Sequence, residues 1–81
     1  MNETNDKNFG PQPIAELMAK HNLKTHDLVA ALPAQQLTHK MVSRACKGRK
    51  LTMNTKLKVL NALNLAAKQS YKLSDLFNYS N

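Results

Sequence analysis

The chain contains few of the residues from which catalytic and metal sites are usually built. Its 81 residues include one cysteine, no tryptophan, two glycines and three prolines, and aromatic residues make up only 5%. A single cysteine, Cys46, excludes an intrachain disulfide and a zinc cluster. The sequence also lacks the CxxC, HExxH, GxSxG and P-loop patterns. We therefore expect a protein that is not an enzyme and that has no catalytic residue, no metal site and no cofactor.

Long hydrophobic runs and a targeting segment are missing as well. No apolar run approaches the ~18 residues that a membrane-spanning helix requires. The polar and acidic residues 1–6 do not have the character of a signal peptide. Together with the single cysteine, these absences predict a cytoplasmic protein with no membrane partner. A mass of 9.1 kDa leaves room for one domain and no large substrate cavity, and no small-molecule ligand is evident.

Acidic residues are scarce, and the imbalance is concentrated in one part of the chain. Five Asp and Glu stand against twelve Lys and Arg, which gives a formal net charge of +7 and a pI of about 9.9. From Lys20 to Lys72 there are eleven basic residues and one acid, Asp27, so this stretch carries +10. Between Thr38 and Lys58 there are seven basic residues and no acid. A solvated helix face usually mixes both signs, so this stretch predicts an anionic partner.

The first twelve residues differ from the rest of the chain. They are rich in asparagine, contain Phe9 as their one aromatic residue and show no periodicity. We predict a disordered polar arm over residues 1–12, one domain over residues 13–79 and a short tail of residues 80–81.

The domain sequence predicts helices only. One helix is expected from Pro13, which suits the first helical position, to about His21. A second should begin with Thr25 as its N-cap, carry Asp27 in its first turn and end before Pro33. The apolar residues expected to face the core from these two helices are Ile14, Leu17, Met18, Leu28, Val29 and Leu32. No stretch alternates apolar and polar residues, so strands are not expected.

Two further helices are expected to begin with threonine caps. Thr38 should cap a helix that ends at Gly48, since glycine tolerates the left-handed conformation of a helix stop. Thr52 should cap a helix that runs to residue 66 or 67. Their expected inward residues are Val42, Ala45, Cys46, Met53, Leu57, Leu60 and Leu63, with Val59 at the edge. A short last helix capped by Ser74 completes an all-α, compact four- to five-helix bundle.

Residues 37–48 resemble a known family. Their sequence, LTHKMVSRACKG, is similar to the recognition helix of lambda-repressor-like helix-turn-helix proteins, which commonly read V-S-x-x-T-V/I-S-R-x-x-x-G. Residues 27–30 and 51–62 are similar to lac-repressor-type headpieces, whereas residues 13–21 and 73–77 look more like the phage repressor and Cro group. The similarity covers residues 13–79. The chain departs from the family in the turn at residues 33–36, which is about three residues longer.

The resemblance implies a small transcriptional regulator of phage-repressor type. Such a protein binds double-stranded DNA sequence-specifically, as a homodimer on a roughly palindromic site, with a recognition helix of about Thr38 to Lys47 in the major groove. We expect residues at the start of that helix to read bases, and the later cations to neutralise phosphates. The predicted DNA-binding residues are Gln35, Gln36, Thr38, His39, Lys40, Ser43, Arg44, Lys47, Arg49, Lys50, Thr55 and Lys56.

Other interpretations stay open at this point. Each predicted contact residue is also compatible with a plain solvated surface. A protein–protein interaction module on the same fold, such as an antitoxin, anti-repressor or adaptor, is favoured by the long turn at residues 33–36 and by Met41, which we expect to be exposed. RNA binding is less favoured, because no aromatic residue interleaves the basic stretch. Cys46 is expected to be a small core residue.

Overall fold

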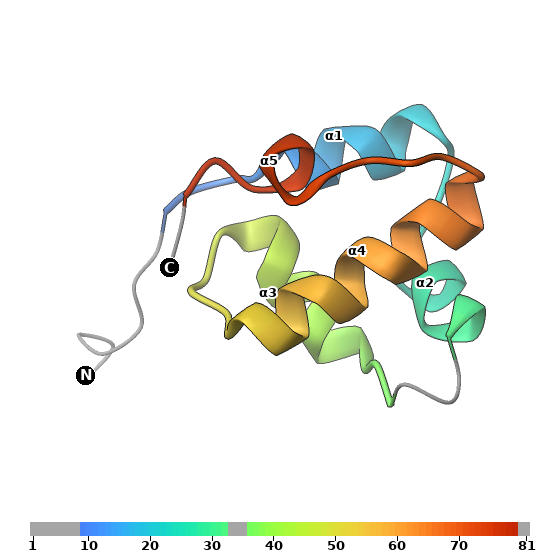
Figure 1. Cartoon of the computed structure of the whole chain (residues 1–81), viewed down its shortest axis with the longest axis horizontal. Helices are drawn as coiled ribbons and strands as arrows, with labels where there is room; N and C mark the ends of the chain where they lie inside the picture. Colours follow the sequence, from blue (N-terminus) through green and yellow to red (C-terminus); the bar gives the residue numbers. More distant parts are fainter. Residues whose placement is uncertain (1–8, 33–35, 80–81) are drawn as a thin grey trace.

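Five helices account for most of the domain. The computed structural model describes residues 9–32 and 36–79. Within them the helices are α1 (Pro13–Lys20), α2 (Thr25–Ala31), α3 (His39–Lys47), α4 (Met53–Ala67) and α5 (Leu73–Leu76), and these residues contain no strand. Figure 1 shows the helices gathered around one core. The expected all-α fold with four to five helices is confirmed.

Neighbouring residues explain where most helices begin and end. Pro13 opens α1. The hydroxyl of Thr38 accepts the N–H of Met41 at 3.1 Å, and Thr52 accepts the N–H of Thr55 at 3.2 Å, so both predicted caps are confirmed. Gly48 ends α3 with a φ of 84°, as predicted.

Two of the predicted caps are wrong by one or two residues. Helix α2 is capped by Lys24 instead of Thr25, and α5 by Lys72 instead of Ser74. In each case a carboxylate three residues later accepts the backbone N–H of the capping residue, at 2.7 Å from Asp27 and 2.9 Å from Asp75. These acids satisfy a backbone donor at the helix start, so no hydroxyl is needed in the cap position.

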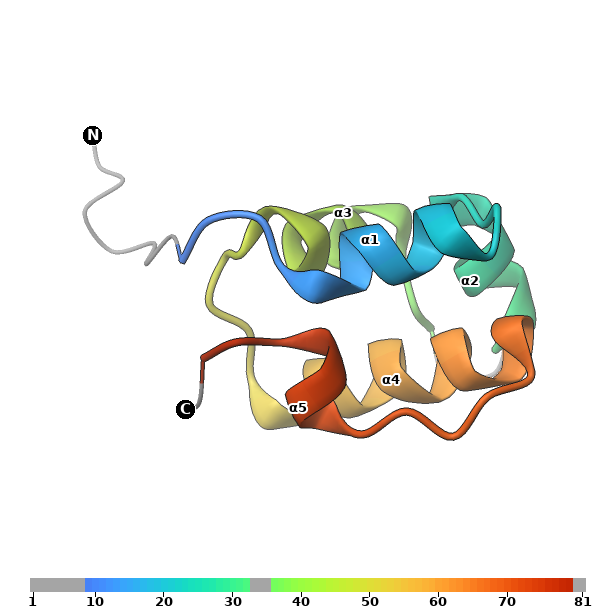
Figure 2. The ribbon, with the colours of Figure 1, turned by 90° about the horizontal axis from the view of Figure 1, so that it is seen from above.

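The core lies between two groups of helices. Figure 2 shows α1 and α3 on one side and α4 and α5 on the other, while α2 packs against both α3 and α4. The largest fully buried side chains come from all five helices: Ile14, Leu28, Val42, Val59, Leu63 and Leu76.

The orientation of α4 differs from the prediction. Leu63 is fully buried as expected, but Met53 and Leu57 are 46% and 42% exposed. The buried residues of α4 are Lys56, Val59, Ala62 and Leu63. Apolar residues occur on most sides of this helix, and its contacts with α2, α3 and α5 select which of them are covered.

Part of the predicted disordered arm is packed on the domain. Residues 1–8 lie outside the described residues, but the prediction is wrong for residues 9–12. The N–H of Phe9 donates to the carbonyl of Gly48 at 2.7 Å, and that of Gln12 to Cys46 at 3.0 Å. The Gln12 side chain is buried and accepts the N–H of Asn78 at 2.8 Å. Because Gly48 has no side chain, the backbone of Gly10 packs directly against it.

Candidate nucleic-acid interface

Basic side chains from α3 and the segment after it gather on one surface. Lys40, Arg44, Lys47 and Arg49 line a hollow of about 210 Å³. A second hollow of about 410 Å³ is lined by Thr38, Lys40, Met41, Arg44, Lys50, Leu51, Thr52 and Thr55. Lys40 and Arg44 border both hollows, so the two are contiguous. We call Lys40, Arg44, Lys47, Arg49 and Lys50 the basic surface.

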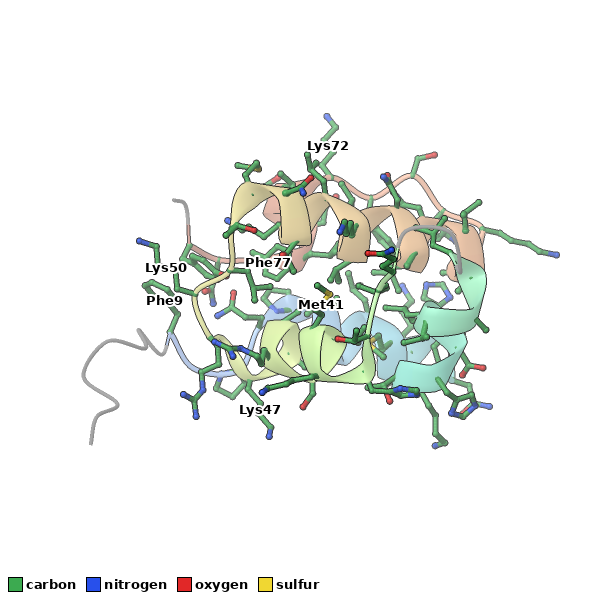
Figure 3. The ribbon with its side chains drawn as sticks, turned by 90° about the horizontal axis from the view of Figure 1, so that it is seen from below. Phe9, Met41, Lys47, Lys50, Lys72 and Phe77 are labelled. Carbon is green, nitrogen blue, oxygen red and sulfur yellow. The ribbon has the colours of Figure 1, made fainter. Side chains whose placement is uncertain are left out.

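Helical spacing and the Gly48 turn place these five cations. Lys40, Arg44 and Lys47 are four and three residues apart, which puts them on one side of α3. Val42 and Ala45 are buried on the other side and fix the helix orientation. Residues 48–52, here called the connector, then lead to α4 and carry Arg49 and Lys50. Lys47 and Lys50 extend away from the ribbon in Figure 3.

The basic surface has a one-signed electrostatic character. No acidic residue lines either hollow. Asp27 and Asp75 are engaged at the starts of α2 and α5, where they accept backbone N–H groups. Lys40 and Arg44 are like charges one helical turn apart, an arrangement that destabilises a helix unless an anion lies nearby. The surface is therefore suited to a polyanion.

The structure brings together most of the residues that the sequence singled out. Seven of the predicted contact residues line the two hollows: Thr38, Lys40, Arg44, Lys47, Arg49, Lys50 and Thr55. His39 and Gln36 are exposed, whereas Ser43 is half-buried, and none of the three lines either of these two hollows. The predicted contact by Gln35 lies outside the described residues.

The prediction for Lys56 is wrong. This side chain is only 2% exposed, and its Nζ lies 4.4 Å from the ring centre of Tyr79 and 5.4 Å from that of Phe77. Burial lowers the pKa of Lys56 below its ordinary value. Its position in the first turn of α4 suggested a phosphate contact, but that turn presents it to the tail after α5. Lys56 is therefore part of the packing between α4 and the chain's end.

Sequence reasoning missed the aromatic residues beside the connector. Phe9 and Tyr79 stack with their ring centres 4.1 Å apart, although 70 positions separate them in the sequence. The Tyr79 hydroxyl also bonds to the connector backbone. The concentration of aromatic residues near the end of the chain was a signal that this segment packs on something, but it did not identify the connector.

Cys46 and His21 are engaged in packing contacts. The Cys46 thiol donates to the sulfur of Met18 at 3.6 Å, and burial raises the pKa of Cys46, which disfavours the reactive thiolate. His21 Nε2 lies 2.9 Å from the hydroxyl of Tyr71. Over residues 9–32 and 36–79 no cluster of three potential ligands could hold a metal ion, and no helix there is long and apolar enough to cross a membrane.

Comparison of the chain with protein-family models, curated proteins and solved structures found no match. The functional assignment therefore depends on the residues of the basic surface and on their arrangement.

Proposed function

We propose that this protein binds double-stranded DNA through the basic surface and acts as a small, sequence-specific transcriptional regulator. One observation carries the proposal: five cations from α3 and the connector surround two contiguous hollows that no acidic residue lines. The resemblance of residues 37–48 to a lambda-repressor-like recognition helix supports it, as does the contact between α2 and α3. In this proposal α2 and α3 form the helix-turn-helix, and α3 enters the major groove.

The side chains divide into two roles. His39 and Lys40 are exposed at the start of α3, where recognition helices meet base edges. Lys47 and Lys50 extend outward farther along and neutralise phosphates, which releases counterions and supplies most of the affinity. Arg44 borders both hollows, between these two groups. Its guanidinium is suited to a bidentate contact with guanine or with a phosphate.

Fluorescence anisotropy of a labelled duplex, measured at several salt concentrations, tests the proposal. The logarithm of the association constant should fall with the logarithm of salt concentration, with a slope of about −0.9 for each neutralised phosphate. Sequencing the duplexes retained from a random pool would first supply the preferred site. Absence of binding at low salt, or a flat salt response, would refute DNA binding.

Two variants of equal charge change locate the contact surface. Arg44→Gln should weaken binding by about 1–3 kcal/mol if Arg44 reads a base, and the loss should be confined to the preferred site. Lys72→Gln is the matched control, because Lys72 is exposed and lies on the other side of the molecule from Lys47 (Figure 3). An equal loss from both variants would mean that net charge, and not the basic surface, determines binding.

A second candidate is protein–protein interaction, with a second copy of this chain as the partner. Met53 and Leu57 favour it, since both are large, apolar and more than two-fifths exposed, one turn apart on α4. Met41 no longer supports it, because Met41 is half-buried and points from α3 toward α4 (Figure 3). Sedimentation equilibrium should detect a dimer that Leu57→Gln weakens. A monomer at all concentrations would exclude self-association.

A further inference from the structure

The hydroxyl of Tyr79 bridges two backbone groups of the connector. It accepts the N–H of Leu51 at 3.3 Å and donates to the carbonyl of Arg49 at 3.1 Å. These two groups flank Lys50, so one hydroxyl holds the backbone on both sides of an exposed cation of the basic surface. The contact joins residues 28 and 30 positions apart in the sequence.

The Tyr79 ring is itself held from several directions. Phe9 stacks on it at 4.1 Å with an interplanar angle of 10°, and Phe77 meets it edge-on at 5.8 Å. The Nζ of Lys56 lies over the ring at 4.4 Å. Phe9 is anchored in turn by its backbone bond to Gly48, the first residue of the connector. Phe9 and Lys50 consequently lie at the same end of the molecule (Figure 3). These contacts fix the position of the Tyr79 ring, and the ring in turn holds its hydroxyl beside the backbone of the connector.

The connector is also held at its start by other backbone bonds: the N–H of Arg49 donates to the carbonyl of Arg44 at 3.1 Å, and the carbonyl of Gly48 accepts the N–H of Phe9 at 2.7 Å. The connector starts with Gly48 in the left-handed region and ends with Thr52, whose hydroxyl is committed to the start of α4. Leu51 is buried, which anchors one point of the segment, while Lys50 is exposed. The bonds to Tyr79 therefore add a fixed point on either side of Lys50.

We propose that Tyr79 is a positioning residue for DNA binding: its hydroxyl fixes the connector so that Arg49 and Lys50 face the phosphates together with the cations of α3. This inference rests on the proposed function. Burial raises the pKa of Tyr79, so the hydroxyl keeps its proton at neutral pH and can donate to Arg49. Holding two cations in place before binding reduces the ordering that binding itself must impose.

Tyr79→Phe removes only the hydroxyl and keeps the stacked ring. We expect DNA affinity to fall about 3- to 10-fold, as for the loss of one or two hydrogen bonds. The salt slope should become shallower by about 0.9 for each phosphate contact that is lost. In the absence of DNA, amide exchange at Leu51 should accelerate while amides in the middle of α4 exchange as before.

Tyr71→Phe is the matched control. This substitution also removes a hydroxyl with a hydrogen-bond partner in a distant part of the chain, since Tyr71 lies 2.9 Å from His21 Nε2. Unlike the hydroxyl of Tyr79, the hydroxyl of Tyr71 does not bond to the connector. We expect this variant to leave DNA affinity and the salt slope unchanged. An equal loss of affinity in both variants, with unchanged slopes, would reduce Tyr79 to a general structural role and overturn the proposal.

The outcomes separate this proposal from the DNA-binding proposal. If the wild-type protein binds DNA and Tyr79→Phe binds with the same affinity and slope, the positioning role is refuted and DNA binding stands. If the wild-type protein does not bind DNA, the proposed function fails. Faster exchange at Leu51 in Tyr79→Phe would then still establish that Tyr79 holds the connector, though for another purpose than DNA binding.

Discussion

Helices α3 and α4 start alike and end up in different surroundings. Each begins after a threonine whose hydroxyl accepts a backbone N–H, from Met41 in α3 and from Thr55 in α4. In α3 the cations lie outside and Val42 lies inside. In α4 a lysine, Lys56, is buried, while Met53 is among the exposed residues. Cations thus lie outside and an apolar residue lies inside in α3, whereas α4 has a buried lysine and an exposed methionine.

The difference lies in how the apolar residues are distributed. In α3 they occupy one side, so only one orientation buries them and the basic surface follows from the spacing. In α4 they occupy most sides, so several orientations would each bury some of them. The contacts with α2 and with the segment around Phe77 decide between these orientations. A helix with one apolar side can be oriented from its own sequence, but a helix covered on several sides cannot.

The largest effect on stability is expected from shortening a buried side chain of α4. Leu63→Ala should lower the free energy of unfolding by about 2–5 kcal/mol, because Leu63 is fully buried and its removal leaves a cavity. Leu57→Ala is the control in the same helix and should change stability by less than about 0.5 kcal/mol, as at other exposed sites. Urea unfolding of both variants gives the difference. Equal losses of stability would contradict an orientation of α4 that buries Leu63 and exposes Leu57.

The second prediction concerns the end of α3. Gly48→Ala should cost about 2–4 kcal/mol, because an alanine in the left-handed region is strained and its Cβ would overlap the backbone of Gly10. Thermal or urea unfolding measures the loss. Since the overlap involves residue 10, deleting residues 1–10 should reduce the cost of Gly48→Ala to about 1–2 kcal/mol, the strain of the left-handed conformation alone. An unchanged cost in the shortened chain would contradict the packing of Gly10 on Gly48.

The bounds and orientation of α3 could be predicted from its own sequence, whereas the positions of Lys56 and Tyr79 depend on contacts between distant parts of the chain. The capping contacts of Thr38 and Gly48 are made with residues within four positions, so their roles as helix caps can be read from the neighbouring sequence. The burial of Lys56 and the contact of Tyr79 with Leu51 join residues more than 20 positions apart. No periodicity encodes such pairs. The basic surface could therefore be predicted from α3, whereas the contacts that hold the connector could not.

A substitution at the end of α4 should raise the stability of the protein, whereas the two substitutions above lower it. Lys68 has a φ of 58° and a ψ of 48°, the left-handed conformation that Gly48 adopts at the end of α3. Lys68→Gly should therefore stabilise the protein by about 0.5–1 kcal/mol, since relief of the left-handed strain exceeds the extra entropy lost by glycine. Lys72→Gly, at a residue with a negative φ, should instead be neutral or destabilising. A loss of stability in Lys68→Gly would show that its side chain contributes packing that outweighs the strain.

The smallest effect is a dependence on pH caused by Lys56. Burial lowers its pKa below 10.5, so the folded protein binds this proton more weakly than the unfolded chain does. The cost of burying the charge is present in full at neutral pH and is relieved between the lowered pKa and 10.5, so the free energy of unfolding should rise there. The raised pKa of Tyr79 lowers stability only above 10.0, which makes the window below 10.0 decisive. Lys56→Met should abolish the rise, and Lys72→Met, at an exposed position, should keep it. A rise that persists in Lys56→Met would assign it to another group.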